Sequence, residues 1–436
     1  MTLEIKSVAV IGGGTMGSGI AAACAAAGRR VLLLESDEAA AAKALERVLA
    51  AAQTVEEKNT LASLIRIGTV IADLPEIAGS DWICEAIVED LAAKRALFAA
   101  LEPLRRDGSV VSTNTSGIPL RAITEGLPDR LRSDIVVTHF FNPVRVMRLL
   151  EIVAGEDTRP EARNALSAFC RDALGKGVVS AKDTVNFIGN RIGCFWMLSG
   201  LHKAKPYLAD GLSIEMIDAL MGVPVGLPAT GLYGLIDLIG LDVMDFVGRN
   251  LANNLPPEDI GHAFTAFPPD ERDMLNRGQL GRKSGGGFYR MVKLPDGRKV
   301  KEVFDLTSGI WRAAQSVQLA PVHGDAKGLL FADSAEGRFA WDLLGETLLY
   351  AADLVPEIAD DVVNIDRALR WGFAWKRGPF ELLDEIDPGR VIATLERQRR
   401  PLPRMLAVLK RAGAESFYKG DRFFGTDGEY HPIPGE

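Results

Sequence analysis

A glycine-rich segment near the start of the chain has residue types that suit the binding of a dinucleotide phosphate. Gly12-Gly13-Gly14-Thr15-Met16-Gly17 follows a short β-branched run, Val8 to Ile11, and precedes the small residues Ser18 to Ala27, which predicts a strand, a turn and a helix. Gly12 permits the tight bend, Gly14 lets the backbone approach a pyrophosphate, and Gly17 lets the helix pack closely on the strand. The start of the helix then faces the phosphates. The cofactor contacts expected in this segment are Gly12, Gly14, Thr15, Met16 and Gly17.

An acidic residue at the end of the next predicted strand indicates which dinucleotide is bound. Glu35 follows Val31 to Leu34 and lies eighteen residues after Gly17. A carboxylate at this place accepts hydrogen bonds from the adenosine ribose hydroxyls and repels a 2′-phosphate. The sequence therefore predicts NAD rather than NADP. The alternative is a glycine turn with a purely structural role.

Three polar residues fall where further predicted strands end. These strands are expected at Trp82 to Ala86, Ser109 to Ser112 and Ile135 to Thr138, with a helix around Lys94 to Leu104. The alternation of strands and helices indicates a mainly parallel sheet. Ligands of such sheets bind beyond the carboxyl ends of the strands, where Glu85, Ser116 and His139 would lie.

Four motifs in this order resemble those of the 3-hydroxyacyl-CoA dehydrogenase family. They are Asn114-Thr115-Ser116, His139-Phe140-Phe141-Asn142-Pro143, Leu150-Glu151-Ile152-Val153 and Phe187-Ile188-Gly189-Asn190-Arg191. The resemblance spans roughly residues 5 to 300. It implies an NAD-dependent oxidation of an (S)-3-hydroxyacyl-CoA thioester to the 3-oxoacyl-CoA, a reaction of fatty acid β-oxidation.

The second and third motifs supply a base and a group that orients it. An alcohol oxidation needs both, together with donors that hold the oxygen while hydride leaves carbon. His139 precedes a rigid apolar turn and is the expected general base. Glu151, twelve residues later in the next strand, is expected to accept a hydrogen bond from the other ring nitrogen and to stabilise the imidazolium. The alternative is a structural histidine at a strand end and an unrelated acid.

The resemblance also assigns residues to the substrate oxygen and to the cofactor. Ser116 and Asn190 match the serine and the asparagine that hydrogen-bond the substrate oxygen, although Ser116 alone would more often be a helix cap. Glu89 and Lys94 match cofactor contacts, and their alternative is a solvated Glu/Lys face. Two departures from the family pattern leave the acyl-chain preference open. Val185-Asn186 replaces the usual Pro-Gly, which predicts a less stiff passage into the second domain, and Gly117 replaces a second serine.

The sequence becomes helical from Phe187 onward and contains an internal repeat. The segment from Ile217-Asp218 to Asp237 is echoed by Ile365-Asp366 to Asp384, at an offset of 148 and then 147 residues. This predicts an α/β Rossmann-type dinucleotide-binding domain followed by two all-α helical domains, a tandem duplicate. The second copy has Gly337-Arg338 in the region of Asn190, so its role is expected to be structural. We expect it to pack on the first copy as a subunit partner would, which predicts a monomer.

The expected domains are 1–185 for cofactor binding, 186–300 for the first helical copy, 301–330 for a linker and 331–436 for the second copy. The duplicated layout resembles the dehydrogenase portion of multifunctional fatty acid oxidation proteins. That resemblance implies a hydratase or thiolase partner, or a crotonase-type domain that these residues do not supply.

Composition narrows the alternatives. The chain has 436 residues, 47% hydrophobic content and a net charge of −8, which disfavours nucleic acid as a partner. No apolar run is long enough for a membrane span, and the early strand leaves no room for a signal peptide, so a cytoplasmic protein is expected. Four scattered cysteines predict neither disulfides nor a metal site. Two other functions stay open: a dehydrogenase of a free hydroxy acid or carnitine, and a non-catalytic NAD-binding structural protein.

Overall fold

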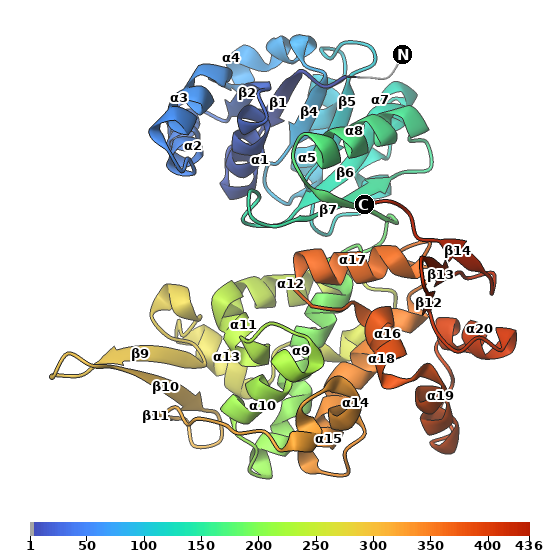
Figure 1. Cartoon of the computed structure of the whole chain (residues 1–436). Coiled ribbons are helices and arrows are strands. Elements are labelled where there is room, and N and C mark those ends of the chain that lie inside the picture. Colours follow the sequence, from blue (N-terminus) through green and yellow to red (C-terminus); the bar gives the residue numbers. More distant parts are fainter. Residues whose placement is uncertain (1–3) are drawn as a thin grey trace. The chain divides into compact units, whose positions relative to one another are not determined.

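The computed structural model describes residues 4–436, which divide into two compact units. The first unit runs to Phe187 and includes 357–360 and 435–436, and the second holds 188–356 and 361–434. Both units are drawn in Figure 1. No helix in the described part of the chain is long and apolar enough to cross a membrane.

The first unit is built around one eight-stranded sheet. Its strand order is β3-β2-β1-β4-β5-β6-β7-β8. All pairs from β3 to β6 are parallel, while β7 pairs antiparallel with β6 and parallel with β8. The strands are β1 (Ser7–Ile11), β2 (Arg30–Glu35), β3 (Ile65–Thr69), β4 (Trp82–Glu85), β5 (Val110–Thr113), β6 (Ile135–Phe140), β7 (Leu149–Ala154) and β8 (Gly177–Ala181). The order of the first six strands is that of a Rossmann fold, which confirms the predicted fold class of this unit.

The central strands are buried along almost their whole length. Every residue of β4, β5 and β6 is buried, as expected for a parallel sheet that is covered on both faces. The surrounding helices are α1 (Thr15–Ala26), α2 (Glu38–Ala50), α3 (Val55–Leu64), α4 (Val70–Asp73), η1 (Leu74–Gly79), α5 (Leu91–Leu101), α6 (Leu120–Thr124), α7 (Asp129–Asp134) and α8 (Pro160–Asp172). All four cysteines are buried and unpaired, and burial raises the pKa of Cys84 and Cys194 to about 12.

Two predicted helices begin three residues earlier than expected. Helix α1 starts at Thr15 rather than Ser18, because the turn is complete at Gly14. Helix α5 starts at Leu91 rather than Lys94, because the Asp90 carboxylate accepts the backbone N–H of Ala93 at 2.8 Å and caps the helix. Lys94, the expected first residue of this helix, is therefore its fourth residue.

The second unit contains both helical copies. Copy one consists of α9 (Gly189–Ala209), α10 (Ile214–Leu220), η2 (Val223–Val225), α11 (Gly231–Ile239), α12 (Leu241–Asn254), η3 (Ile260–Phe264), α13 (Pro269–Asn276) and η4 (Arg282–Ser284). Copy two consists of η5 (Pro321–His323), α14 (Ala326–Leu330), α15 (Ala335–Ala340), the π-helical turn η6 (Trp341–Gly345), α16 (Glu346–Asp353), α17 (Val362–Gly372), α18 (Pro379–Ile386), α19 (Pro388–Arg397) and α20 (Arg404–Ala412).

One buried aspartate makes the same hydrogen bonds in each copy. Asp218 accepts the backbone N–H of Tyr233 at 2.7 Å and the hydroxyl of Tyr289 at 2.8 Å. Asp366 accepts the backbone N–H of Phe380 at 2.8 Å and the hydroxyl of Tyr418 at 2.7 Å. The repeat in the sequence therefore marks a repeated set of interactions between the helices and the end of each copy.

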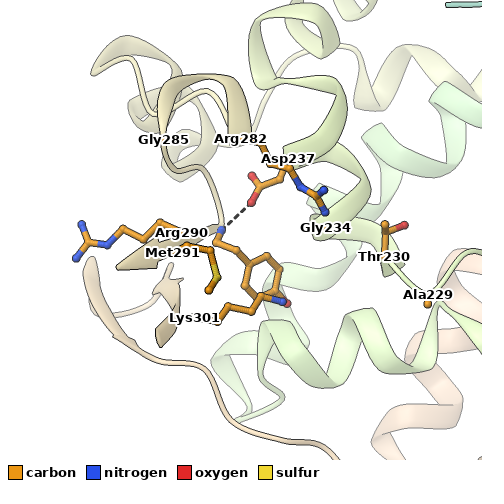
Figure 2. Close-up of a pocket in the computed structure, with 10 residues that line it drawn as sticks. Ala229, Thr230, Gly234, Asp237, Arg282, Gly285, Arg290, Met291 and Lys301 are labelled. Carbon is orange, nitrogen blue, oxygen red and sulfur yellow. Dashed lines mark hydrogen bonds between the residues drawn. The ribbon is translucent and has the colours of Figure 1, made fainter. Parts of the chain in front are cut away.

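A second aspartate is repeated in the same way. Asp237 accepts the backbone N–H of Phe288 at 2.7 Å, and Asp384 accepts that of Phe417 at 2.7 Å. Burial raises the pKa of both carboxyl groups to about 6. Figure 2 shows Asp237 in the wall of a cavity of about 760 Å³ between α11 and the strands that follow, with Arg282 beside it.

Both copies are helical, as predicted, and each ends in a small antiparallel sheet that the prediction of all-α domains did not include. The strands are β9 (Tyr289–Lys293), β10 (Lys299–Asp305) and β11 (Ile310–Ala313) in copy one, and β12 (Tyr418–Lys419), β13 (Arg422–Phe424) and β14 (Tyr430–Pro432) in copy two. Strands β10 and β11 occupy part of the segment 301–330 that was expected to be a linker. Strand β10 was not predicted because its sequence is rich in charged residues and lacks a continuous apolar run. Only Val303 and Phe304 in it are buried.

The two copies pack on each other within the second unit, as expected. Helix α9 of copy one contacts α15, η6, α16 and α17 of copy two. A Cβ atom added to Gly193 would lie 2.3 Å from the ring of Phe373, and the rings of Trp196 and Trp375 meet at 6.3 Å between centroids. Small residues on α9 thus let copy two approach its backbone.

A buried glutamate in copy one gives a test of pH-dependent stability. Glu271 in α13 is 0% exposed, and within residues 4–436 neither carboxyl oxygen meets a donor from another residue. Burial raises its pKa to about 7 from an ordinary value of 4.5. Its contribution to stability is therefore fully present below pH 4.5 and is lost as the pH rises through about 7. The glutamine of Glu271→Gln cannot ionise. The unfolding free energy of this variant minus that of the unaltered chain should therefore increase by roughly 2 kcal/mol between about pH 5 and about pH 8.

The measurement is urea unfolding of the full chain at both pH values. Glu258→Gln changes an exposed glutamate of the same copy and serves as the control, with a pH profile like that of the original chain. An identical pH dependence in Glu271→Gln would mean that the Glu271 carboxyl group is hydrated in solution.

Candidate active site

His139 and Glu151 are direct neighbours across two strands. The antiparallel register of β6 and β7 pairs them, and cross-strand partners project from the same face of a sheet. Nδ1 of His139 lies 2.6 Å from Oε2 of Glu151, and the side chains are 4% and 0% exposed. Because an ionised carboxylate only accepts, Nδ1 is assigned the hydrogen, which leaves Nε2 as the basic nitrogen.

Two aromatic rings lie against the imidazole. Phe141 and Phe187 approach it with centroid distances of 4.5 and 5.5 Å. The ring of His139 is therefore held on one side by a carboxylate and on others by apolar surface. This environment keeps water away from the base and restricts its orientation.

The loop after β5 is fixed by Glu89. Its Oε1 accepts the hydroxyl of Thr115 at 2.6 Å and the backbone N–H groups of Ser116 and Gly117 at 2.8 and 3.1 Å. Ser116 does not cap a helix, because α6 begins at Leu120 with Pro119 as its N-cap; within the loop, Oγ1 of Thr115 accepts the backbone N–H of Ile118 at 2.9 Å. Ser116 is exposed on this loop, where its hydroxyl is accessible to a ligand.

Lys94 does not lie on a solvated face. It is 1% exposed, and its Nζ lies 2.7 Å from Oε1 of Glu85 and 3.4 Å from Oε2 of Glu89. Glu85 also accepts the hydroxyl of Thr113 at 2.6 Å. Removing one member of a buried pair of this kind leaves an uncompensated charge, so Lys94 and Glu85 depend on each other. Through Glu89, Lys94 supports the loop that carries Ser116.

The glycine loop has the geometry that a dinucleotide phosphate requires. Gly12 has φ of +99°, and an added Cβ would lie 2.5 Å from the carbonyl oxygen of Ala86. A Cβ on Gly17 would lie 1.7 Å from the carbonyl oxygen of Gly12, whereas one on Gly14 would meet nothing within 4 Å. The first and third glycines are thus required by packing, and the space over the second suits a pyrophosphate at the start of α1, where Thr15 and Met16 lie.

Glu35 is the last residue of β2 and is tied to the same loop. Its Oε1 accepts the backbone N–H of Gly13 at 2.6 Å. The side chain is half-buried, so part of the carboxylate stays accessible to ribose hydroxyls. The residues at the ends of β1 and β2 therefore fit NAD.

Sequence reasoning assigned no role to Asn114, which connects two of these loops. Its Oδ1 accepts the backbone N–H of Phe140 at 3.0 Å and so joins the end of β5 to the residue that follows His139. Its position at the end of a strand, beside Ser116, was the signal that could have found it. Asn190, the remaining expected substrate contact, is half-buried in the first turn of α9 in the second unit.

Family models match two consecutive parts of the chain. The NAD binding domain of 3-hydroxyacyl-CoA dehydrogenase matches residues 7–184, and the C-terminal domain of the same enzyme matches residues 187–291. The chain belongs to the 3-hydroxyacyl-CoA dehydrogenase family. This confirms the predicted family and the predicted cofactor, NAD.

Similar proteins extend this finding over almost the whole chain. A probable 3-hydroxyacyl-CoA dehydrogenase of Bacillus subtilis is 34% identical over 99% of this chain, and a putative fatty acid oxidation complex trifunctional enzyme of Rickettsia felis is 35% identical over 93%. The chain spans only 58% and 57% of the length of these two relatives. The crystal structure of 3-hydroxybutyryl-CoA dehydrogenase from Escherichia coli K12 has a TM-score of 0.70 and 25% identity, covering 91% of this chain and 95% of that one.

Asn186, which departs from the family pattern, keeps the backbone conformation that a glycine would adopt at this position. Asn186 and Phe187 have φ of +59° and +51°, in the left-handed region. Glycine adopts this region freely, and asparagine is among the residues that tolerate it best. Asn186 therefore preserves the turn where 3-hydroxyacyl-CoA dehydrogenases usually have glycine.

No group of three or more histidine, cysteine or acidic residues within 4–436 is placed to hold a metal ion.

Proposed function

We propose that this chain oxidises the 3-hydroxyl of an (S)-3-hydroxyacyl-CoA to the 3-oxoacyl-CoA with NAD. The observation that supports it most is the buried pair of His139 and Glu151, 2.6 Å apart at the end of β6. A base with an orienting acid in an apolar setting is what removal of a hydroxyl proton needs. A structural NAD-binding protein has no use for such a pair.

Each residue of the site has a role in this proposal. Nε2 of His139 takes the hydroxyl proton, and Glu151 stabilises the imidazolium that forms. NAD, when bound, accepts the hydride from C3 of the substrate. Ser116 and Asn190 donate hydrogen bonds to the substrate oxygen. Glu89 and Lys94 hold the Ser116 loop beside the cofactor site, and Phe141 and Phe187 exclude water from the base.

The deciding experiment is a spectrophotometric assay of NADH oxidation with 3-oxoacyl-CoA thioesters of increasing chain length. We expect turnover with the thioesters and none with the corresponding free 3-oxo acids or 3-dehydrocarnitine. Turnover with only the free acids or 3-dehydrocarnitine would favour the alternative dehydrogenase, and turnover with none of them would favour a structural protein. The series also measures the acyl-chain preference. We also propose that a hydratase or thiolase acts with this chain, because the Rickettsia felis relative is named a putative trifunctional enzyme of a fatty acid oxidation complex.

Glu35 gives a prediction about cofactor choice. We expect kcat/KM with NADH to exceed that with NADPH by about 10² or more, because the carboxylate repels a 2′-phosphate. Glu35→Gln keeps an oxygen for the backbone N–H of Gly13 and removes the charge, so it should mainly raise KM for NADH. Glu46→Gln, at an exposed position on α2, is the matched control and should change neither constant. Equal efficiency of the unaltered chain with both cofactors would contradict the role of Glu35.

A further inference from the structure

Tyr350 belongs to copy two, yet its hydroxyl bonds to an ion pair in copy one. Nε of Arg191, in α9, donates to this hydroxyl at 2.6 Å, and the hydroxyl donates to the carboxylate of Asp259 at 3.0 Å. Arg191 also pairs directly with Asp259. The side chains of Arg191 and Asp259 are 1% and 6% exposed, so solvent does not screen these bonds. Burial raises the pKa of Tyr350, which keeps its proton available for Asp259.

Copy two makes further contacts with the same end of α9. The ring of Phe195 stacks on that of Tyr350, with centroids 4.1 Å apart. The backbone at Gly193 lies against the ring of Phe373, which leaves no space for a side chain there. Gly193 and Phe195 follow Asn190 by three and five residues. The part of α9 that begins with Asn190 is therefore shaped by residues of copy two.

We propose that Tyr350 is a positioning residue for Asn190. Its hydroxyl holds Arg191, and through Arg191 it holds the first turn of α9, which carries the Asn190 amide that is proposed to bond the substrate oxygen. This inference rests on the proposed function, because it takes Asn190 as a donor to that oxygen. Arg191 follows Asn190 directly, so movement of its buried guanidinium displaces the same helical turn. A small misplacement of a donor is costly in catalysis.

The test compares two tyrosine variants of the full chain in the NADH assay. Tyr350→Phe removes the hydroxyl and keeps the stacked ring. Tyr207→Phe is the matched control, because the Tyr207 hydroxyl also joins α9 to copy two, at Asp342, but Tyr207 lies seventeen residues after Asn190. We expect Tyr350→Phe to lower kcat by about 5- to 30-fold, with KM for NADH unchanged. Tyr207→Phe should lower kcat by less than about twofold.

A double-mutant cycle with Asn190→Ala tests whether Tyr350 acts through Asn190. In the Asn190→Ala background, Tyr350→Phe should lower kcat further by less than about twofold. Losses that multiply, equal effects of the two tyrosine variants, or full activity of Tyr350→Phe would each overturn the positioning role. A chain that reduces no 3-oxoacyl-CoA would refute the proposed function and this inference with it. A slow Asn190→Ala beside a fully active Tyr350→Phe would refute the positioning role alone.

Discussion

His139→Ala should lower kcat for 3-oxoacyl-CoA reduction by about 10² to 10⁴, the usual effect of removing a general acid or base. KM for NADH should stay within about twofold, because the imidazole interacts with the reacting oxygen and not with the adenosine half of the cofactor. Steady-state kinetics across a range of pH values measure both constants. His431→Ala, on the small sheet of copy two, is the matched control and should behave like the unaltered chain.

Glu151→Gln tests the orientation of the imidazole in the same experiment. The Gln amide can donate to Nδ1 and so select the tautomer with hydrogen on Nε2, which cannot accept the hydroxyl proton. We therefore expect a large fall in kcat without loss of the fold, since the side chains have nearly the same shape.

Near-full activity of His139→Ala at neutral pH would mean that another residue is the base.

The sequence sufficed for the parts of this site that depend on local order. The glycine loop and Glu35 are set by neighbours in the chain and lie where the sequence predicts them, whereas β6 runs two residues beyond Thr138 and includes His139. The pairing of His139 with Glu151 was expected from the motifs that resemble the family, and the antiparallel register of β6 and β7, which was not predicted, brings the two side chains together.

The sequence did not reveal features that depend on distant residues. Lys94 could be read as a solvated lysine because its partner Glu85 lies nine residues away, on a strand end that only the folded sheet brings beside it. The small sheets were missed because β10 is charged and only partly buried. The repeat of Asp218 and Asp366 was recognised in the sequence, but the hydrogen bonds that these residues make were not predicted. Their partners Tyr289 and Tyr418 lie 52 or more residues further along the chain.

Deleting residues 331–436 should leave a chain that associates or aggregates more than the 436-residue chain does. The deletion removes α15, η6, α16 and α17, which contact α9, together with Tyr350, Phe373 and Trp375. Phe195 and Trp196 are 4% and 1% exposed in the full chain and would lose these partners. Exposure of a large apolar side chain costs about 1.5 to 3 kcal/mol, and a contiguous apolar patch promotes association. Size-exclusion chromatography with light scattering measures the result.

The 436-residue chain should elute as a monomer, because copy two covers the face of copy one that a second subunit would otherwise cover. Adding residues 331–436 as a separate polypeptide is the matched control, and it should restore solubility if the loss comes from the uncovered face of α9. A truncated chain that stays monomeric and fully active would refute both the pseudo-dimer and the need for copy two. Loss of activity in a monomeric truncated chain would instead separate the two roles, because copy two would then be dispensable for solubility but still required at the end of α9 that carries Asn190.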